Sequence, residues 1–210
     1  MSTMDETQPP ALEFWFEFAS TYSYVGAMRI EQECARAGVA LRWKPFLLGP
    51  LFTEQLGIQD SPFKVHPVRG RYMWRDLERL CGKHGLPWRR PSEFPRRSVL
   101  AARAACALEG DPRQGECIRT LFRANFASDQ GIEDPAVVAS AVRAGGGDAE
   151  AVLARAASPE AKAALRANTE RARASGIFGA PNCLVGSELF FGQDRIDDAI
   201  AWATSSRAGK

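Results

Sequence analysis

The order of strand and helix patterns constrains the fold of this chain more than any other feature. Strand patterns lie only near the two ends of its 210 residues. Residues 12–18 alternate between a face of Leu and Phe side chains and a face of Glu, Trp and Glu, which predicts a strand. A helix is expected over residues 22–36, before Gly38, and a second strand over residues 39–46. Short connections make this a β-α-β unit with parallel strands and a right-handed crossover.

The other end of the chain completes the sheet. Residues 181–186 and 188–192 have strand patterns on either side of a plausible hairpin turn, and a last helix is expected over residues 193–204. The two ends together predict a four-stranded mixed sheet with a helix after each half. This is the plan of a thioredoxin-like α/β fold, with one domain split between residues 11–48 and 176–205.

The intervening residues 49–175 are expected to form a connecting loop and a large all-helical insertion. Because residues 47–70 are rich in Gly and Pro, they predict a long ordered loop. Helical patterns then cover residues 71–84, 96–109, 112–128, 135–144, 149–156 and 159–174. Three dipeptides each offer an N-cap followed by Pro at the first helical position: Asp111-Pro112, Asp134-Pro135 and Ser158-Pro159.

Composition and charge exclude several classes of protein. Apolar residues make up 45% and charged residues 25%, as in globular proteins, and no apolar run approaches the roughly 18 residues of a membrane span. The polar N-terminus lacks the pattern of a signal peptide, so we expect a cytoplasmic protein. The net charge of +2 conceals a basic segment, residues 64–123, with 14 Lys and Arg against 6 Asp and Glu. Without a nucleic-acid-binding module, this segment favours small anionic ligands.

The five cysteines argue against a disulfide framework and against a metal site. Their number is odd, no two form a CxxC pair, and the chain has only two histidines. Cys34, Cys81 and Cys106 lie in helical patterns and are expected to be small buried side chains. Cys183 is expected to point into the sheet, with little prospect of being a nucleophile.

Ser20 is the first candidate functional residue. It lies at the corner between the first strand and the first helix, where unpaired N–H groups and the helix dipole favour an anion. A hydroxyl group there can donate a hydrogen bond to a thiolate or an oxyanion. Ser23 is a second candidate, and either serine can be simply an N-cap.

Two segments near the end of the chain supply further candidates. Residues 176–186, GIFGAPNCLVG, predict a fixed turn with a cis Ala180-Pro181 bond, which leaves a backbone edge free to pair with an extended peptide. Gln193 and Asp194 open the last helix. Asp194 can cap that helix, or it can bind an ammonium group with the help of Gln193.

The basic loop and helix of residues 61–80 supply possible carboxylate receptors. For Arg75 and Arg79 we expect a solvated face with Arg–Asp pairs. The candidates for binding a carboxylate are Lys64, Arg69, Arg71 and Arg75.

The segments FEFASTYSYVG and GIFGAPNCLVGSELFFGQDR together resemble the 2-hydroxychromene-2-carboxylate isomerase family. That family lies next to the kappa-class glutathione transferases, in the DsbA-like branch of the thioredoxin superfamily. The resemblance implies that Ser20 holds the glutathione sulfur as thiolate and that the backbone of Ala180, beside cis Pro181, pairs with the cysteinyl unit. It further implies that the γ-glutamyl end and the glycyl carboxylate are received, respectively, by Gln193 with Asp194, and by Arg69 with Lys64 as a second candidate.

The function implied is that of a glutathione-dependent isomerase in aromatic-compound degradation. Glutathione thiolate would add reversibly to an aromatic or chromene carboxylate, and by analogy the protein would be a homodimer. The alternatives are a kappa-like transferase that conjugates electrophiles, a thiol–disulfide oxidoreductase, and a non-catalytic thiol- or peptide-binding module. Thr21 departs from the proline that the family often has there, which can alter the substrate. For Asn182 a structural hydrogen bond is favoured over a role near the sulfur.

Overall fold

A four-stranded mixed sheet forms the centre of the computed structural model, which describes residues 10–208. The strands are β1 (Ala11–Phe16), β2 (Ala40–Pro45), β3 (Asn182–Val185) and β4 (Glu188–Phe191), in the order β2-β1-β3-β4. β1 pairs in parallel with β2, and β3 runs antiparallel to both β1 and β4. The predicted mixed sheet is confirmed, with β1 at its interior because it carries the strongest run of large apolar side chains.

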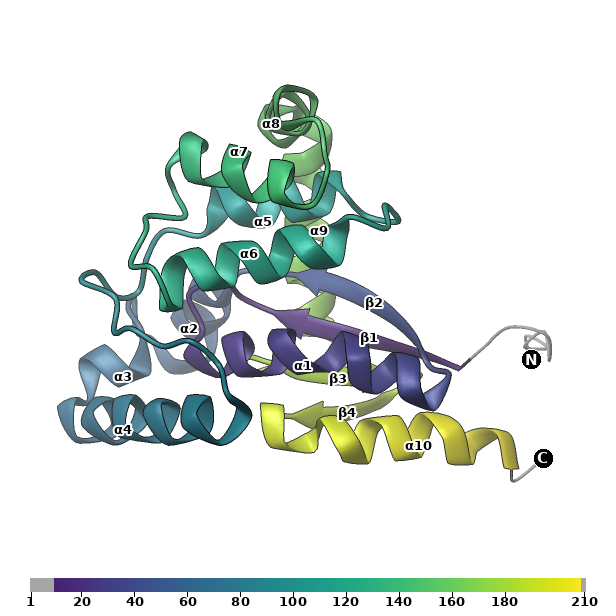
Figure 1. The fold of residues 1–210 in the computed structure, drawn as a ribbon. Helices are drawn as coiled ribbons and strands as arrows, with labels where there is room; N and C mark the ends of the chain where they lie inside the picture. The colour runs from purple at the N-terminus through teal and green to yellow at the C-terminus, as the bar shows by residue number, and fades with distance from the viewer. Residues whose placement is uncertain (1–9, 209–210) are drawn as a thin grey trace.

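One face of the sheet is covered by α1 (Thr21–Ala37) and α10 (Ile196–Ala208), which lie side by side in Figure 1. A 3₁₀ turn, η1 (Gln193–Arg195), precedes α10. The helix α1 begins after Ser20 and ends at Gly38, which adopts the left-handed conformation with φ 65°. The buried rings of Phe14 and Phe16 pack beneath these helices.

The other face of the sheet is also covered, by α2 (Leu48–Leu56) and α9 (Pro159–Ala174). Trp15 and Phe46 form the centre of the apolar cluster there. β1 is therefore buried on both faces, and two acidic side chains are buried with it: Glu13 within the strand and Glu17 directly after it. Arg171 pairs with Glu13 at 2.7 Å, whereas Glu17 has no ion pair among the described residues.

A group of inserted helices stacks over the β2 side of the sheet, with α9 beside them (Figure 1). They are α5 (Val99–Ala107), α6 (Gln114–Phe126), α7 (Pro135–Ala144) and α8 (Ala149–Ala157). The helix α4 (Pro67–His84) lies apart from this stack and contacts α1. The helix α6 lies against α1, where Phe126 stacks on Tyr24 at a centroid distance of 5.5 Å. Within the described part of the chain, no helix combines the length and apolar character needed to cross a bilayer.

The predicted loop over residues 47–70 is wrong. The segment contains α2, the short helix α3 (Pro62–Val65) and the start of α4. Its Gly and Pro residues mark helix boundaries, because Gly57 ends α2 in the left-handed conformation and Pro62 and Pro67 occupy first-turn positions. The Gly and Pro content that suggested a long ordered loop instead reflects several helix ends that lie close together in the sequence.

The three predicted helix starts have different outcomes. Asp134 and Ser158 cap α7 and α9 as predicted, with Pro at the first helical position. Asp111 is not a cap, because α6 begins later, at Gln114. The Asp111 carboxylate instead accepts a hydrogen bond from the backbone N–H of Arg113 at 2.9 Å and pairs with its guanidinium.

Candidate functional site

A cavity of about 540 Å³ lies where β1 leads into α1, between α2, α3, the turn before β3 and the end of β4. This volume falls within the range of small-molecule sites. Six aromatic residues from separate parts of the chain line it: Tyr22, Phe52, Phe63, Phe94, Phe178 and Phe191. The cavity is therefore suited to a ligand with a flat apolar part.

Ser20 lies on the wall of this cavity and is also the N-cap of α1. Its Oγ accepts a hydrogen bond from the Ser23 N–H at 3.2 Å and donates one to the Ala180 carbonyl oxygen at 3.0 Å. The positive end of the α1 dipole is directed at the same point, so a negative charge beside Ser20 is favoured. Capping and presenting a hydroxyl group to the cavity are thus compatible roles. Ser23 itself is fully buried and absent from the wall.

The Ala180–Pro181 peptide bond is cis, as predicted. Ala180 lines the cavity, and Pro181 is buried behind it. Asn182 is also buried and donates a hydrogen bond from Nδ2 to the Gly179 carbonyl oxygen at 2.7 Å. This is the structural hydrogen bond that the sequence favoured for Asn182.

Phe178 and Phe191 are cavity residues that sequence reasoning missed. Their side chains are large and apolar, yet 52% and 46% exposed, and their rings lie 4.5 Å apart. Phe178 lies inside the GIFGAP segment, and Phe191 precedes the Gly192 turn. Exposed aromatic rings at a cavity are typical of ligand contacts.

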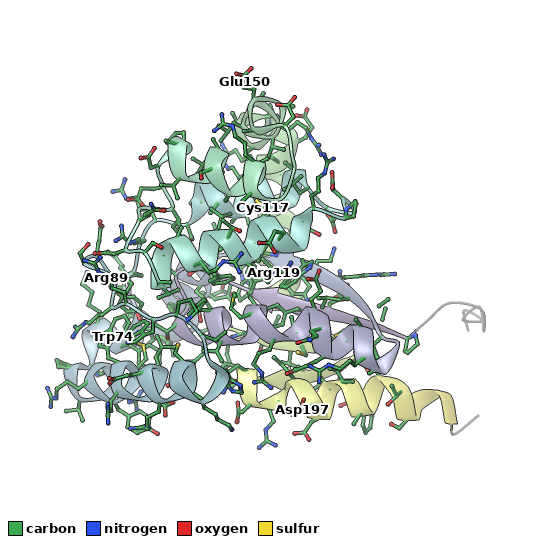
Figure 2. The ribbon with its side chains drawn as sticks, in the orientation of Figure 1. Trp74, Arg89, Cys117, Arg119, Glu150 and Asp197 are labelled. Carbon is green, nitrogen blue, oxygen red and sulfur yellow. The ribbon has the colours of Figure 1, made fainter. Side chains whose placement is uncertain are left out.

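The aromatic wall is supported from α4. Trp74 stacks on Trp88 at a centroid distance of 5.8 Å and meets the edge of Phe94 at 4.7 Å. Figure 2 shows Trp74 between α4 and the segment that carries Arg89. The inserted helices thereby hold Phe94 against the cavity.

Arg69 is the basic side chain on the described part of the cavity wall. It forms no ion pair with the described residues, so its guanidinium is available to a carboxylate. Lys64 lies off the wall and pairs with Asp60, which is on the wall, at 2.6 Å. Arg75 and Arg79 pair with Glu78 and Asp76, as the sequence predicted for that exposed face.

Gln193 and Asp194 lie in η1 and do not line the cavity. Gln193 is buried, and its side-chain oxygen accepts a hydrogen bond from Arg29 Nη1 at 3.0 Å. Asp194 is exposed. The structure therefore brings Ser20, Ala180 and Arg69 to one cavity, and it places Lys64, Gln193 and Asp194 outside its wall.

Glu17 is a further cavity residue that sequence reasoning missed. It directly follows β1, is only 7% exposed and lines the cavity. Burial raises its pKa from 4.5 to about 7, although hydrogen bonds from the Ser98 side chain and from the backbone of Ala19 and Phe18 lower it. A carboxyl group within a run of aromatic residues, three positions before Ser20, was the signal available in the sequence.

None of the five cysteines lines the cavity, and all are buried as free thiols. Burial raises the pKa of Cys81 to about 11 and of Cys34, Cys106 and Cys117 to about 12, and it raises that of Cys183 further. Cys183 lies in β3 and is fully buried. Within residues 10–208, no cluster of His, Cys, Asp and Glu could hold a metal ion.

The comparisons with known proteins identify the family of this chain. A family model described as a DSBA-like thioredoxin domain matches residues 11–200. The 2-hydroxychromene-2-carboxylate isomerase of Sphingobium xenophagum is 24% identical over 186 residues, covering 89% of this chain and 94% of that protein. Glutathione S-transferase kappa 2 of Caenorhabditis elegans is 26% identical over 205 residues, covering 88% of each.

The fold has solved counterparts. A structure of 2-hydroxychromene-2-carboxylate isomerase matches with a TM-score of 0.81 and 20% identity, over 94% of this chain and 98% of that one. At this identity the likeness establishes the arrangement of helices and strands. The predicted thioredoxin-like sheet with a helical insertion is thus confirmed.

Proposed function

The chain belongs to the DSBA-like thioredoxin domain family, and from this premise we propose that it is a glutathione-dependent isomerase. Its substrate would be an aromatic or chromene carboxylate, and glutathione would be used catalytically rather than consumed. The observation that carries the proposal is the position of Ser20, whose hydroxyl group lies on the cavity wall at the N-terminus of α1. The isomerase relative of similar length supports the assignment.

The residues of the cavity fit glutathione. Ser20 would offer its hydroxyl group as a donor to a thiolate beside the helix N-terminus once its O–H turns from the Ala180 carbonyl oxygen, to which it donates in the structure, toward the sulfur. The backbone of Ala180 would pair with the cysteinyl unit, and the unpaired guanidinium of Arg69 would receive the glycyl carboxylate. Gln193 and Asp194 would have to turn toward the ligand to receive its γ-glutamyl end, because neither lines the cavity.

Bound glutathione would supply a thiolate that adds reversibly to a conjugated carbon, so that a double bond becomes a single bond about which the substrate can rotate. The protein's own contribution is binding and orientation. Ser20 stabilises negative charge on the sulfur, and the aromatic wall holds the ring of the substrate. Because the wall is largely apolar, it also limits access of water to the reacting atoms.

A kappa-like glutathione transferase is the second candidate function. The relative from Caenorhabditis elegans favours it at a similar identity and coverage. The same cavity would serve both reactions. They differ in whether the adduct is released or the thiol is eliminated from it.

Turnover assays with chromene carboxylate and glutathione test the proposal. We expect interconversion of the isomers that depends on glutathione without consuming it. Net formation of a glutathione conjugate would favour the transferase, and absence of any dependence on glutathione would refute both assignments.

The variant Ser20→Ala separates catalysis from capping. As a cap, Ser20 is worth about 1 kcal/mol of stability. We expect turnover to fall by at least about a hundredfold, equivalent to about 2.7 kcal/mol, while stability falls by no more than the cap value. If the loss of turnover, converted to free energy, is no larger than the loss of stability, Ser20 acts only as a capping residue.

A further inference from the structure

Glu17 is a buried carboxyl group that the proposed function has not yet used. It lines the main cavity together with its neighbours Ala19 and Ser20. Its carboxylate Oε1 accepts a hydrogen bond from the Ala19 N–H at 3.2 Å, and its carbonyl oxygen accepts one from the Ser20 N–H at 3.0 Å. The turn that positions the Ser20 hydroxyl group therefore also fixes the Glu17 carboxyl group.

Glu17 also borders a second cavity, of about 610 Å³, which adjoins the first. The two share Glu17, Ala19, Leu48, Gly49 and Pro95 as wall residues. Glu17 thus lies between the two cavities.

Two other acidic groups on the wall of the main cavity, Asp60 and Tyr22, do not change their protonation near neutral pH, whereas Glu17 can. Asp60 is held ionised because a hydrogen bond from Lys64 lowers its pKa. Tyr22 remains protonated, since burial and the neighbouring Asp76, which accepts its hydroxyl proton in a hydrogen bond at 3.1 Å, raise its pKa. The remaining charged side chains of the two walls are Arg69 on the main cavity and Arg96, Arg97, Arg103 and Glu133 on the second.

None of these cations pairs with Glu17. Arg96 pairs with Asp129, and Arg69, Arg97 and Arg103 form no ion pair with the described residues. The cause of the raised Glu17 pKa, to about 7, is therefore burial without a compensating positive charge. A carboxylate in this condition gains stability when it takes up a proton.

We infer that Glu17 is the base of the site, and that its carboxylate accepts the thiol proton when glutathione binds beside Ser20. This inference rests on the proposed function. In the step, the S–H bond breaks, its electron pair stays on sulfur, and an O–H bond forms on the Glu17 carboxylate. One negative charge moves from a buried carboxylate to the sulfur, where the Ser20 hydroxyl group and the α1 N-terminus stabilise it. No proton needs to leave the site.

Proton release during glutathione binding tests this assignment. At about pH 8, free glutathione is mostly a thiol and Glu17 is mostly ionised. Calorimetry in buffers of different ionisation enthalpy counts the protons released, and the ultraviolet absorbance of the bound ligand counts the thiolate formed. Because the thiolate charge that forms near Glu17 favours the protonated form of its carboxyl group, we expect thiolate in the wild type with a ratio of released protons to thiolate close to zero.

Two variants complete the experiment. The variant Glu17→Gln lacks the carboxylate that accepts the thiol proton. Any thiolate that still forms must release its proton to the buffer, so the ratio of released protons to thiolate should rise to about one. Loss of the thiolate absorbance in this variant would equally support the inference. Glu133→Gln removes an exposed carboxylate from the second cavity alone and should behave as the wild type does.

The outcomes separate this inference from the proposed function. Glutathione binding with about one proton released per thiolate in the wild type would overturn the role of Glu17 and leave the glutathione site intact. Binding of glutathione without thiolate in the wild type would have the same effect. Absence of glutathione binding would overturn both. The wild-type ratio decides the question even if Glu17→Gln fails to fold.

Discussion

Replacing Glu17 by Gln should change the pH dependence of stability in a calculable way. Burial raises the pKa of the Glu17 carboxyl from 4.5 to about 7. Between these two values the folded protein binds more protons than the unfolded chain, so the stability of the wild type falls as the pH rises through this window. The loss of stability that comes from ionising the buried Glu17 is absent at a pH below the pKa of the unfolded state and complete at a pH above the pKa of the folded state. At about 1.36 kcal/mol per pKa unit, it reaches about 3 kcal/mol.

The amide of the Glu17→Gln variant does not titrate, so the variant lacks this cost. Its stability relative to the wild type should therefore rise by roughly 2 to 3 kcal/mol between about pH 5 and about pH 8. The amide keeps a side-chain oxygen that can accept the Ala19 N–H. Any constant effect of the substitution, such as a weakened hydrogen bond to Ser98, cancels when the two pH values are compared.

Urea denaturation of both proteins at several pH values measures this difference. Subtraction of the two curves removes the contributions of all other titrating groups, because these are common to both proteins. Two parallel curves would refute the reasoning, since they would mean that Glu17 titrates alike in the folded and unfolded states. A relative loss of stability in Glu17→Gln at high pH would mean that an unrecognised cation stabilises the carboxylate.

Two further predictions concern the contact between α3 and α4 and the basic residues proposed to bind a carboxylate. Gly70→Ala should destabilise the protein by about 1 to 3 kcal/mol in thermal denaturation, because the new Cβ would overlap the carbonyl oxygen of Phe63 in α3. Gly82→Ala, in the same helix but with nothing within 4 Å of its Cβ, should instead stabilise the protein by about 0.5 to 1 kcal/mol; a similar loss in both variants would contradict the contact argument. Arg69→Ala should weaken glutathione binding at least about tenfold in calorimetry, whereas Lys64→Ala should have a smaller effect because Lys64 lies off the wall and is already paired with Asp60. A larger effect of Lys64→Ala would exchange the roles of the two cations.

The sequence was informative where local patterns and chain order agree. Alternation of side chains in residues 12–18, the Gly38 helix end and the strands around Gly186 predicted the sheet, because each depends on neighbouring residues alone. The position of Ser20 at a strand-to-helix corner and the Gly-Ala-Pro turn at Pro181 were accessible for the same reason. These local features place two of the site residues without any knowledge of packing.

Features that depend on packing between distant segments could not be predicted. The burial of Glu17 arises because α2 and the segment before α5 cover a face of β1 that the alternation marked as polar. The aromatic wall brings Phe52, Phe94 and Phe178 together from positions far apart in the chain. In residues 47–70, the Gly and Pro residues correctly indicated breaks in regular structure, but they could not show whether the residues between the breaks were helical.

The burial of every cysteine gives this protein a property that bears on the chemistry proposed for it. Thiol–disulfide exchange requires a thiolate, and all five thiols have their pKa raised by burial far above neutral pH. The folded chain is therefore expected to react slowly with oxidised glutathione and with electrophiles. Under the proposed function it would form few mixed disulfides in a glutathione-rich cell, and the reactive sulfur in its cavity would be the one that a ligand brings.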